Sequence, residues 1–378
     1  MKIAINCWIL RNKNVDGIGN FCIQTVQWLA QSHPEDEFLL LCDKSFTENY
    51  FDFPNTKIHR ILPPYRHPLL YIFYMETVVK YFLSAHKPDV FIGIEGFLSL
   101  GSKVKQIPVI HDLNFEHYPH DLPWRNRMYY RRFFPLFASK ATRISTVSTF
   151  TKNDIVRRYA VPENKIDVVF CGIKEKFRPL SQLEIDAARL KYSASQPYFF
   201  FIGSMHPRKN LLRLIEAFDV FREKNPSATH KLILAGSILW DDKMFDDILK
   251  RVSHRTDIIF TGRVSDEELI YLLGAATALT FVPTFEGFGL PIVEAFQAEV
   301  PVVCSNVTSM PEVAGDAAII VDPFNVTEIA TAMALLANDG AMRKSLIEKG
   351  KDRRRFFSWQ QTADLLYASI LKTVNPLY

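Results

Sequence analysis

Residues 278–304 read ALTFVPTFEGFGLPIVEAFQAEVPVVC, and their order of elements decides the fold. The apolar runs at 278–282 and 300–304 are typical of buried strands. Between them a glycine-rich turn precedes residues 290–298, whose apolar side chains have helical spacing. Pro291 suits the first turn of a helix, because the N–H that proline lacks has no helical partner there. The stretch predicts a strand, a helix and a second strand, which is the unit of a parallel sheet.

The same alternation continues along the whole chain. Strand-like runs lie at 2–7, 38–42, 90–92, 108–110, 143–147, 166–169, 198–202, 231–235, 258–260, 278–282 and 300–304. Helix-like segments lie at 18–31, 69–85, 125–138, 149–158, 211–221, 242–253, 266–273, 290–298 and 327–336. A polar segment with two prolines, 171–197, divides them into two series, and we interpret it as a linker plus a short helix. We therefore predict an α/β fold of two Rossmann-like, doubly wound domains, with ligands held in a central cleft between them.

Composition excludes several classes of protein. A chain of 378 residues suits two domains, and 48% hydrophobic with 23% charged residues is ordinary for a globular protein. The net charge of +4 is too small to indicate a nucleic-acid partner. The five cysteines are scattered without a C-x-x-C pair, which favours reduced, buried thiols over disulfides or a zinc site. The short apolar start predicts no signal peptide and no apolar window predicts a membrane span, so we expect a cytoplasmic location.

Two adjacent cations follow a buried strand in FFFIGSMHPRKNLLRLIEAF, residues 199–218. The strand stops at Gly203, Arg208 and Lys209 follow in the turn, and Asn210 is a plausible N-cap of the next helix. The guanidinium fork of arginine suits phosphate, and lysine adds a point charge. The other interpretation is a solvated turn with two surface cations.

Two carboxylates flank the glycine-rich turn of the opening stretch. Glu286 lies in the turn, and Glu294 is expected in the first turn of the helix, where the dipole favours a negative charge. Free amides near Gly289 would also favour a bound anion. An ionised carboxylate only accepts hydrogen bonds, so Glu294 could bind vicinal hydroxyls such as those of a ribose. Alternatively, Glu294 only stabilises the helix and Glu286 has no role.

A basic and aromatic segment, PWRNRMYYRRFFPLF, spans residues 123–137 and contains four arginines, two tyrosines and three phenylalanines. It could be an ordinary helix with one face in the core and the other in solvent. It could also contact an anionic membrane surface or a lipid-linked acceptor.

The segment EGFGLPIVEAFQAEVPVV resembles the signature of glycosyltransferase family 4, also called glycosyl transferase group 1, whose members are retaining enzymes of the GT-B fold. Further counterparts follow in the family's order: GSMHPRKNLLRLIEAF, TGRVSDEELIYLLGAATALTFVPTFEGFG and SNVTSMPEVAGDAAIIVDPFN, and in the first half VDGIGNF, PVIHDLNF and STVSTFTKNDIVRRY. The start, NCWILRNKNVDGIGNFCIQTVQWLA, is similar to bacterial mannosyltransferases of O-antigen and related polysaccharides. The resemblance covers nearly the whole chain.

The resemblance implies a role for each matching residue. Arg208 and Lys209 would hold the donor diphosphate, Glu286 would lie by the hydroxyls of the donor sugar, and Glu294 would bind the ribose. His111 would approach the reacting end of the sugar, although a histidine at a strand end is often only a hydrogen-bonded core residue. The other implied nucleotide-sugar-binding residues are Gly17, Gly19, Gly203, Arg263, Val264, Gly287, Phe288, Gly289 and Leu290. The two glycines of DGIGN could instead be plain turn glycines.

The implied reaction is transfer of a hexose from a nucleotide sugar, with GDP-mannose favoured, to a hydroxyl of a growing glycan or lipid-linked acceptor in cell-surface polysaccharide synthesis. No cofactor and no metal ion are expected, because the chain has no D-x-D triplet and protein cations could replace Mg²⁺. The alternatives are a GT-B-fold nucleotide-sugar 2-epimerase and a non-catalytic sugar-binding protein. Base, sugar, acceptor and oligomeric state stay open.

The resemblance also implies the domain boundaries. The N-terminal, acceptor-binding domain would comprise residues 1–172 and, because the last helix crosses back, about 358–378. Residues 173–196 would form a linker, and 197–357 the domain that binds the nucleotide sugar.

Overall fold

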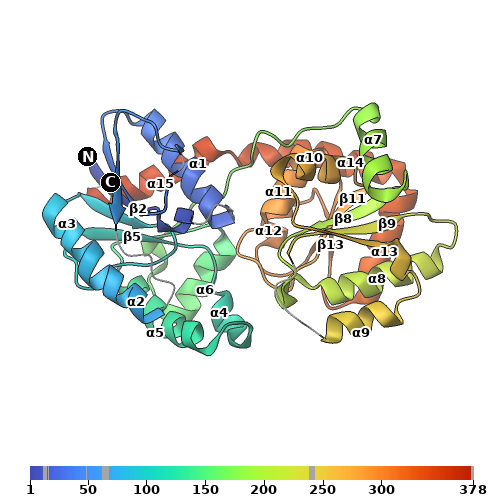
Figure 1. The fold of residues 1–378 in the computed structure, drawn as a ribbon, viewed down its shortest axis with the longest axis horizontal. Coiled ribbons are helices and arrows are strands. Elements are labelled where there is room, and N and C mark those ends of the chain that lie inside the picture. The colour runs from blue at the N-terminus through green and yellow to red at the C-terminus, as the bar shows by residue number, and fades with distance from the viewer. Residues whose placement is uncertain (12–14, 16, 48, 62–67, 238–242, 376–378) are drawn as a thin grey trace. The chain divides into compact units, whose positions relative to one another are not determined.

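The computed structural model of the chain describes residues 1–11, 15, 17–47, 49–61, 68–237 and 243–375. They form two compact units, Met1–Gly172 with Ser358–Tyr378, and Ile173–Phe357. Figure 1 shows that each unit is a central sheet with helices on both faces. All strand pairs in both sheets are parallel. The predicted fold class, two doubly wound Rossmann-like units, is confirmed.

The sheet of the first unit has the strand order β3-β2-β1-β4-β5-β6-β7. Its strands are β1 (Lys2–Asn6), β2 (Glu37–Asp43), β3 (Thr56–Ile61), β4 (Val90–Gly93), β5 (Lys105–Ile110), β6 (Ile144–Thr146) and β7 (Ile166–Val168). The sheet grows in one direction from β1 to β3 and in the other from β4 onward. The topological switch point therefore lies between β1 and β4, where Asn6 is paired with Gly93.

The helices of the first unit are α1 (Gly17–Ser32), α2 (Pro68–Phe73), α3 (Lys80–His86), α4 (Asn114–His117), α5 (Trp124–Lys140), α6 (Thr149–Tyr159) and α15 (Trp359–Val374). In Figure 1, α1 and α15 lie on one side of the sheet and α2 and α5 on the other. A π-helical segment, Tyr74–Val79, joins α2 to α3, so the single helix predicted for 69–85 has three parts. The last helix belongs to this unit, where the Thr362 hydroxyl donates to the Phe170 carbonyl over 2.7 Å.

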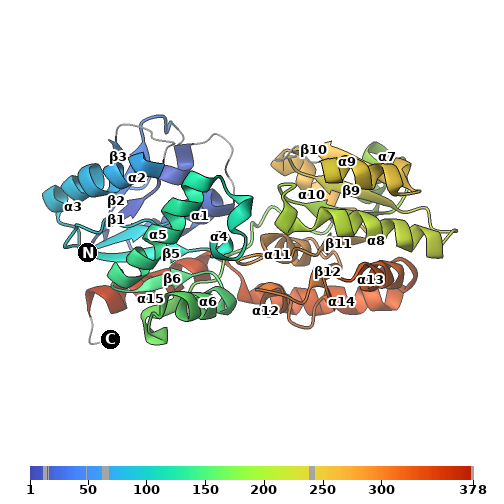
Figure 2. The ribbon, with the colours of Figure 1, turned by 90° about the horizontal axis from the view of Figure 1, so that it is seen from below.

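The sheet of the second unit has the order β10-β9-β8-β11-β12-β13, so its switch point lies between β8 and β11. Its strands are β8 (Tyr198–Ile202), β9 (Lys231–Ala235), β10 (Ile258–Gly262), β11 (Ala278–Phe281), β12 (Val302–Ser305) and β13 (Ile319–Val321). Its helices are α7 (Gln182–Ser193), α8 (Leu211–Lys224), α9 (Lys243–Arg251), α10 (Asp266–Gly274), α11 (Leu290–Gln297), α12 (Met310–Ala314), α13 (Val326–Asn338) and α14 (Gly340–Arg353). Helices α8 and α13 pack side by side (Figure 2).

Burial explains which strands the sequence revealed. Residues 199–201 of β8 are phenylalanines with no exposed surface, as expected of a central strand covered by helices on both faces. The two strands that the sequence reading missed, β3 and β13, are both edge strands. Strand β3 reads TKIHRI and has no fully buried residue, so it lacks a continuous apolar run.

The segment predicted to be a linker, 173–196, contains α7, which packs against α10 in the second unit. The Arg189 guanidinium donates to the Ala275 carbonyl over 3.1 Å, and the Tyr192 hydroxyl donates to the Glu268 carboxylate over 3.3 Å. All five cysteines are buried free thiols, so no disulfide crosslinks either unit.

Two glycines bring the carboxyl ends of the second unit's strands close together. The Gly203 N–H donates to the Ala235 carbonyl over 3.0 Å, and the Gly236 N–H donates to the Gly262 carbonyl over 2.8 Å. Gly236 has φ +142°, and a Cβ atom there would lie 1.9 Å from the Gly203 carbonyl oxygen. Only glycine fits at position 236, because a side chain would force β8 and β9 apart.

We expect Gly236→Ala to lower the free energy of unfolding by on the order of 3 kcal/mol, from backbone strain and the clash with Gly203. The matched control is Gly262→Ala, which also has positive φ, +67°, but has no atom within 4 Å of the added Cβ. It should cost about 1 kcal/mol. Urea denaturation measures both, and equal losses would contradict the steric explanation.

Candidate active site

Two loops meet at the switch point of the second sheet, one after β8 and the other after β11. The Arg208 carbonyl accepts hydrogen bonds from the Thr284 N–H over 2.8 Å and from the Thr284 hydroxyl over 3.2 Å. Asn210 directly precedes α8, as predicted, but its side chain does not cap the helix, and its Oδ1 accepts from the Arg213 guanidinium over 3.0 Å. Its amide nitrogen donates to the Val282 carbonyl over 3.0 Å and to the Pro323 carbonyl over 2.7 Å. These bonds hold the two loops together.

The joined loops bring three predicted site residues into one ionic cluster. The Arg208 guanidinium donates to Oε1 of Glu286 over 2.6 Å, and the Lys209 ammonium bonds to the same oxygen. Arg208 also donates to the Phe285 carbonyl over 3.1 Å, and the Lys209 ammonium lies 5.0 Å from the centre of the Phe281 ring. Two cations therefore share one carboxylate at the carboxyl edge of the sheet.

Glu286 stays ionised because the attraction of the two neighbouring cations exceeds the cost of burying its charge. Burial alone would raise the pKa of Glu286, but the Lys209 and Arg208 charges and their hydrogen bonds hold the pKa below its ordinary value. The carboxylate fixes both cations in place, side by side. Such a pair of cations suits an anion with two or more charged oxygens, such as a diphosphate.

The turn between Glu286 and Glu294 is fixed by Ser309, the residue just before α12. The Ser309 hydroxyl donates to the Glu286 carbonyl over 3.0 Å and to the Phe288 carbonyl over 3.1 Å. Gly289 precedes α11 with φ +105°, and a Cβ there would lie 2.6 Å from the Met310 Cε. The Phe288 side chain is buried, so this part of the turn can offer a ligand its backbone only. No side chain caps α11, whose first amides are therefore suited to an anion.

Glu294 lies in the second turn of α11, since the helix begins at Leu290, and our prediction of a first-turn position was wrong. The helix dipole therefore does little for its carboxylate. Burial raises the pKa of Glu294 to about 7, and Asp266 adds to the rise while Lys174 and Lys176 oppose it. Among the described residues the Glu294 side chain has no hydrogen-bond partner, so it is available to a ligand.

Lys174, Lys176 and Asp266 are residues that sequence reasoning did not assign to the site. The Asp266 carboxylate forms ion pairs with the ammonium groups of Lys174, over 3.5 Å, and Lys176. Both lysines lie in the segment interpreted as a linker, and Asp266 is the first residue of α10. The paired lysines of GIKEKF were the available signal, but only the fold places them near Glu294.

The other predicted residues divide between the two units. Gly203 ends β8, and Arg263 and Val264 follow β10, so they belong to the carboxyl edge of the second sheet. His111 follows β5 of the first sheet, and its Nε2 lies 2.9 Å from the Ile94 carbonyl oxygen. Gly17 and Gly19, which are the exposed first residue and a buried residue of α1, also lie in the first unit.

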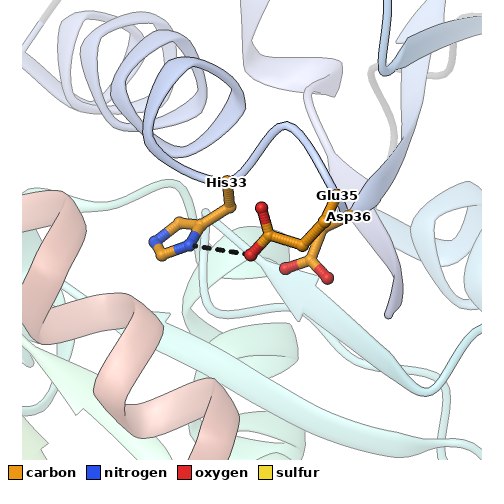
Figure 3. Close-up of side chains that lie close together, drawn as sticks. All are labelled: His33, Glu35 and Asp36. Carbon is orange, nitrogen blue, oxygen red and sulfur yellow. Dashed lines mark ion pairs between the residues drawn. The ribbon is translucent and has the colours of Figure 1, made fainter.

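One group of potential metal ligands lies at the opposite, amino edge of the first sheet, just before β2. In Figure 3, His33, Glu35 and Asp36 approach one another, with His33 Nδ1 3.6 Å from Glu35 Oε1. Both Asp36 oxygens already have partners, the amino group of Met1 and the Tyr367 hydroxyl at 2.7 Å. We assign this group no metal, because an ion would compete with those bonds.

Helix α5 separates the basic and aromatic residues of segment 123–137. Tyr129, Phe134 and Phe137 are buried in the core, as the ordinary reading predicts. Trp124 and Met128 are 59% and 62% exposed, and a surface hollow of about 370 Å³ is lined by Arg127, Met128, Arg131 and Arg132. None of the helices in the described part of the chain combines the length and apolarity needed to cross a membrane.

Comparison with known proteins places this chain among enzymes that transfer sugars. Residues 15–177 match the model of Glycosyltransferase Family 4, and residues 184–353 match that of Glycosyl transferases group 1. O-antigen chain mannosyltransferase B of Escherichia coli is 30% identical over 355 residues, which are 91% of this chain and 93% of that protein. Serotype-specific mannosyltransferase WbdA of Escherichia coli is 27% identical over 271 residues, 69% of this chain and 32% of that protein.

Solved structures share the fold at low sequence identity. Sucrose-phosphate synthase from Thermosynechococcus elongatus has a TM-score of 0.79 and 17% identity, with all of both chains covered. Anabaena Alr3699/HepE, solved with UDP and glucose, has a TM-score of 0.75 and 16% identity over 98% of this chain and 99% of that one. WaaG, a glycosyltransferase involved in lipopolysaccharide biosynthesis, has a TM-score of 0.71 and 15% identity over 99% and 100%.

The raised pKa of Glu294 predicts a pH dependence of stability. Between its ordinary pKa of 4.5 and the folded value of about 7, the folded chain holds a proton that the unfolded chain has released. The stabilising contribution is therefore complete below about pH 4.5 and is lost as the pH rises through 7. Relative to Glu294→Gln, the wild type should lose up to about 3 kcal/mol of unfolding free energy between pH 4.5 and 8.

The measurement is urea denaturation of both proteins across this pH range. The matched control is Glu267→Gln, which removes an exposed carboxylate from α10. If that control and Glu294→Gln differ from the wild type by the same amount at every pH, the assignment of the titration to Glu294 is wrong.

Proposed function

The chain belongs to glycosyltransferase family 4 and is a glycosyltransferase of the GT-B fold, and from this premise we propose its donor, its acceptor and its site. The proposed reaction moves a hexose, with mannose from GDP-mannose favoured, to a hydroxyl of a growing glycan or lipid-linked acceptor in cell-surface polysaccharide synthesis. The observation that carries the proposal is the pair of cations held by Glu286 at the switch point of the second sheet. The mannosyltransferase relatives support mannose and O-antigen-like products.

Arg208 and Lys209 are the proposed diphosphate ligands. In the reaction the bond between the anomeric carbon and the phosphate oxygen breaks, and negative charge develops on the leaving diphosphate. The two cations are already fixed by Glu286, so they stabilise that charge without reorganising. The backbone amides of Gly287, Gly289 and Leu290 and the start of α11 supply further donors.

Retention of configuration follows if the acceptor hydroxyl attacks the face that the diphosphate leaves. The new bond joins the acceptor oxygen to the anomeric carbon, and the acceptor's proton passes to the departing phosphate oxygen. This route requires no protein base. We assign His111 to the donor sugar near its reacting end and Glu286 to the sugar hydroxyls.

Glu294 is the proposed ribose ligand, and its raised pKa makes the binding dependent on pH. Vicinal hydroxyls donate hydrogen bonds to the ionised carboxylate and so favour that form over the protonated one. Nucleotide binding near pH 7 should then release a proton. Arg263 and Val264, after β10, are the proposed lining of the base pocket. We propose no metal ion and no cofactor, since Arg208 and Lys209 can take the charge-neutralising role of Mg²⁺.

We expect GDP-mannose to raise the melting temperature in a panel of GDP, UDP and dTDP sugars, because a ligand that binds only the folded state stabilises it. With an acceptor glycan, the products should be free GDP and a new α-linked glycoside. An isomerised donor would instead support the epimerase, and binding without any change in the donor would support a sugar-binding protein.

Two variants test the site. Arg208→Ala should lower kcat about 100-fold. Glu294→Ala should weaken GDP binding about tenfold and abolish proton release, measured by calorimetry in buffers of different ionisation enthalpy. The matched control is Lys224→Ala, which removes an exposed cation from the far end of α8. Wild-type transfer by both site variants would refute the assignment.

We further propose that the exposed face of α5 contacts an anionic membrane surface, where a lipid-linked acceptor would be found. This α5 surface comprises Trp124, Arg125, Met128, Arg131 and Arg132. Its exposed tryptophan and methionine can enter the headgroup region while its arginines pair with lipid phosphates. The buried side of α5 packs in the aromatic core, so substitutions on its exposed side should leave the fold intact.

At low salt the protein should co-sediment with vesicles containing phosphatidylglycerol and should not co-sediment with neutral vesicles. The charge-reversal variant Arg125→Glu/Arg132→Glu should lose most of this binding. Arg157→Glu, which reverses an exposed charge on α6, is the control and should bind like the wild type. Equal binding by all three proteins, or none to anionic vesicles, would reject the proposal.

A further inference from the structure

The first sheet has a switch point of its own, between β1 and β4, and polar side chains gather there. In open α/β sheets, ligands bind outside the carboxyl ends of the strands where the strand order reverses. The second sheet holds the Arg208–Lys209–Glu286 cluster at this position. In the first sheet the same position is marked by Asn6, the last residue of β1, its partner Gly93, and Glu95, two residues after β4 ends.

Three polar side chains near this switch point are buried without satisfying their hydrogen-bonding groups. Asn6 is 1% exposed, and neither its amide nitrogen nor its amide oxygen has a partner in the described part of the chain. Tyr74 and Tyr129 are 1% and 5% exposed, and their hydroxyls also have no hydrogen-bond partner in the described part of the chain. Native proteins seldom leave buried polar groups unpaired, so such a group indicates a missing water or ligand.

The three side chains come from different elements and face the same side of the sheet. Tyr74 belongs to the π-helical segment and Tyr129 to α5, and both pack in one apolar cluster with Ala4 of β1. Side chains alternate along a strand, so Asn6 faces the side that Ala4 faces. Burial raises the pKa of both tyrosine hydroxyls, and the charge of Glu95 adds to the rise.

Aromatic rings surround these groups. Trp8 stacks on Tyr74 with ring centres 5.1 Å apart, and Tyr71 lies 6.0 Å from Tyr129. The Trp8 N–H donates to the Asp43 carboxylate over 2.9 Å, which fixes its ring. Tyr71 and Glu95 are partly exposed and form the accessible rim of the group. The π-helical segment agrees with a functional role, because such segments are frequent at functional sites.

The chemistry of the group suits a neutral, hydroxyl-rich ligand and not an anion. An amide, two phenol hydroxyls and a carboxylate can donate to and accept from several hydroxyl groups. The carboxylate would repel a phosphate, whereas aromatic rings pack well against the C–H faces of a pyranose. These features contrast with the positively charged site of the second unit.

We infer that Asn6, Tyr74, Tyr129 and Glu95 form the subsite for a neutral sugar residue at the end of the acceptor. The inference rests on the proposed transferase function and adds the chemical class of the acceptor's reacting end. The subsite binds the sugar through side chains of β1, the π-helical segment, α5 and the loop after β4.

The test distinguishes a sugar-binding subsite from buried polar groups that bind only water. Methyl α-glycosides of mannose, glucose, galactose and N-acetylglucosamine are titrated calorimetrically into the full chain, with and without GDP. The variants are Tyr74→Phe and Tyr129→Phe, which remove hydroxyls that have no protein partner and should not lower the melting temperature. We expect the wild type to bind at least one glycoside, each variant to bind it about five- to tenfold more weakly, and GDP binding to be unchanged.

The matched control is Tyr198→Phe, whose buried hydroxyl donates to the Leu272 carbonyl over 2.8 Å in the second unit. This control should lose stability and keep glycoside affinity. If no glycoside binds at tens of millimolar, or if both phenylalanine variants bind like the wild type, the subsite is refuted. The result is independent of the proposed function, which fails separately if no nucleotide sugar is bound or consumed.

Discussion

The bond of Arg208 and Lys209 to one oxygen of Glu286 is the interaction on which the candidate site depends. It joins the loop after β8 to the loop after β11, and it keeps two cations side by side where mutual repulsion would separate them. Burial increases the strength of this ionic cluster, because water does not screen it. Two cations held side by side in this way suit the diphosphate of the proposed donor.

The rest of the second unit maintains this geometry. Gly236 allows the carboxyl ends of β8 and β9 to lie close together. The Ser309 hydroxyl, just before α12, donates to the Glu286 carbonyl and fixes the turn that contains this glutamate. In the proposed site, Glu294 and the Lys174–Asp266 pair extend the polar surface from the position of the diphosphate toward that of the ribose. Burial raises the pKa of Glu294, whereas the adjacent cations hold the pKa of Glu286 below its ordinary value.

The two sheets use the same topological position for different chemistry. In the second unit the switch point holds two cations and suits the diphosphate of the proposed donor, whereas in the first it holds hydroxyl and amide groups and one carboxylate beside aromatic rings. This difference is what a transferase needs, since its donor carries the charge and its acceptor contributes a hydroxyl. Family membership establishes a glycosyltransferase, and the unpaired side chains of Asn6, Tyr74 and Tyr129 give the acceptor a proposed place.

The sequence by itself determined the alternation of strands and helices, the two-domain organisation and the residues of the donor motif. Those features are local: central strands are continuous apolar runs, and the motif residues follow strand ends within a few positions. Only the tertiary structure decided that Glu286 binds Arg208 and Lys209, that Lys174 and Asp266 lie near Glu294, and that Asn6 lies beside β4. Each depends on strand order, which brings together segments far apart in the chain. The edge strand β3 escaped sequence reading for a related reason, since its partly exposed residues lack the apolar run that central burial imposes. The other missed edge strand, β13, is an apolar stretch of only three residues.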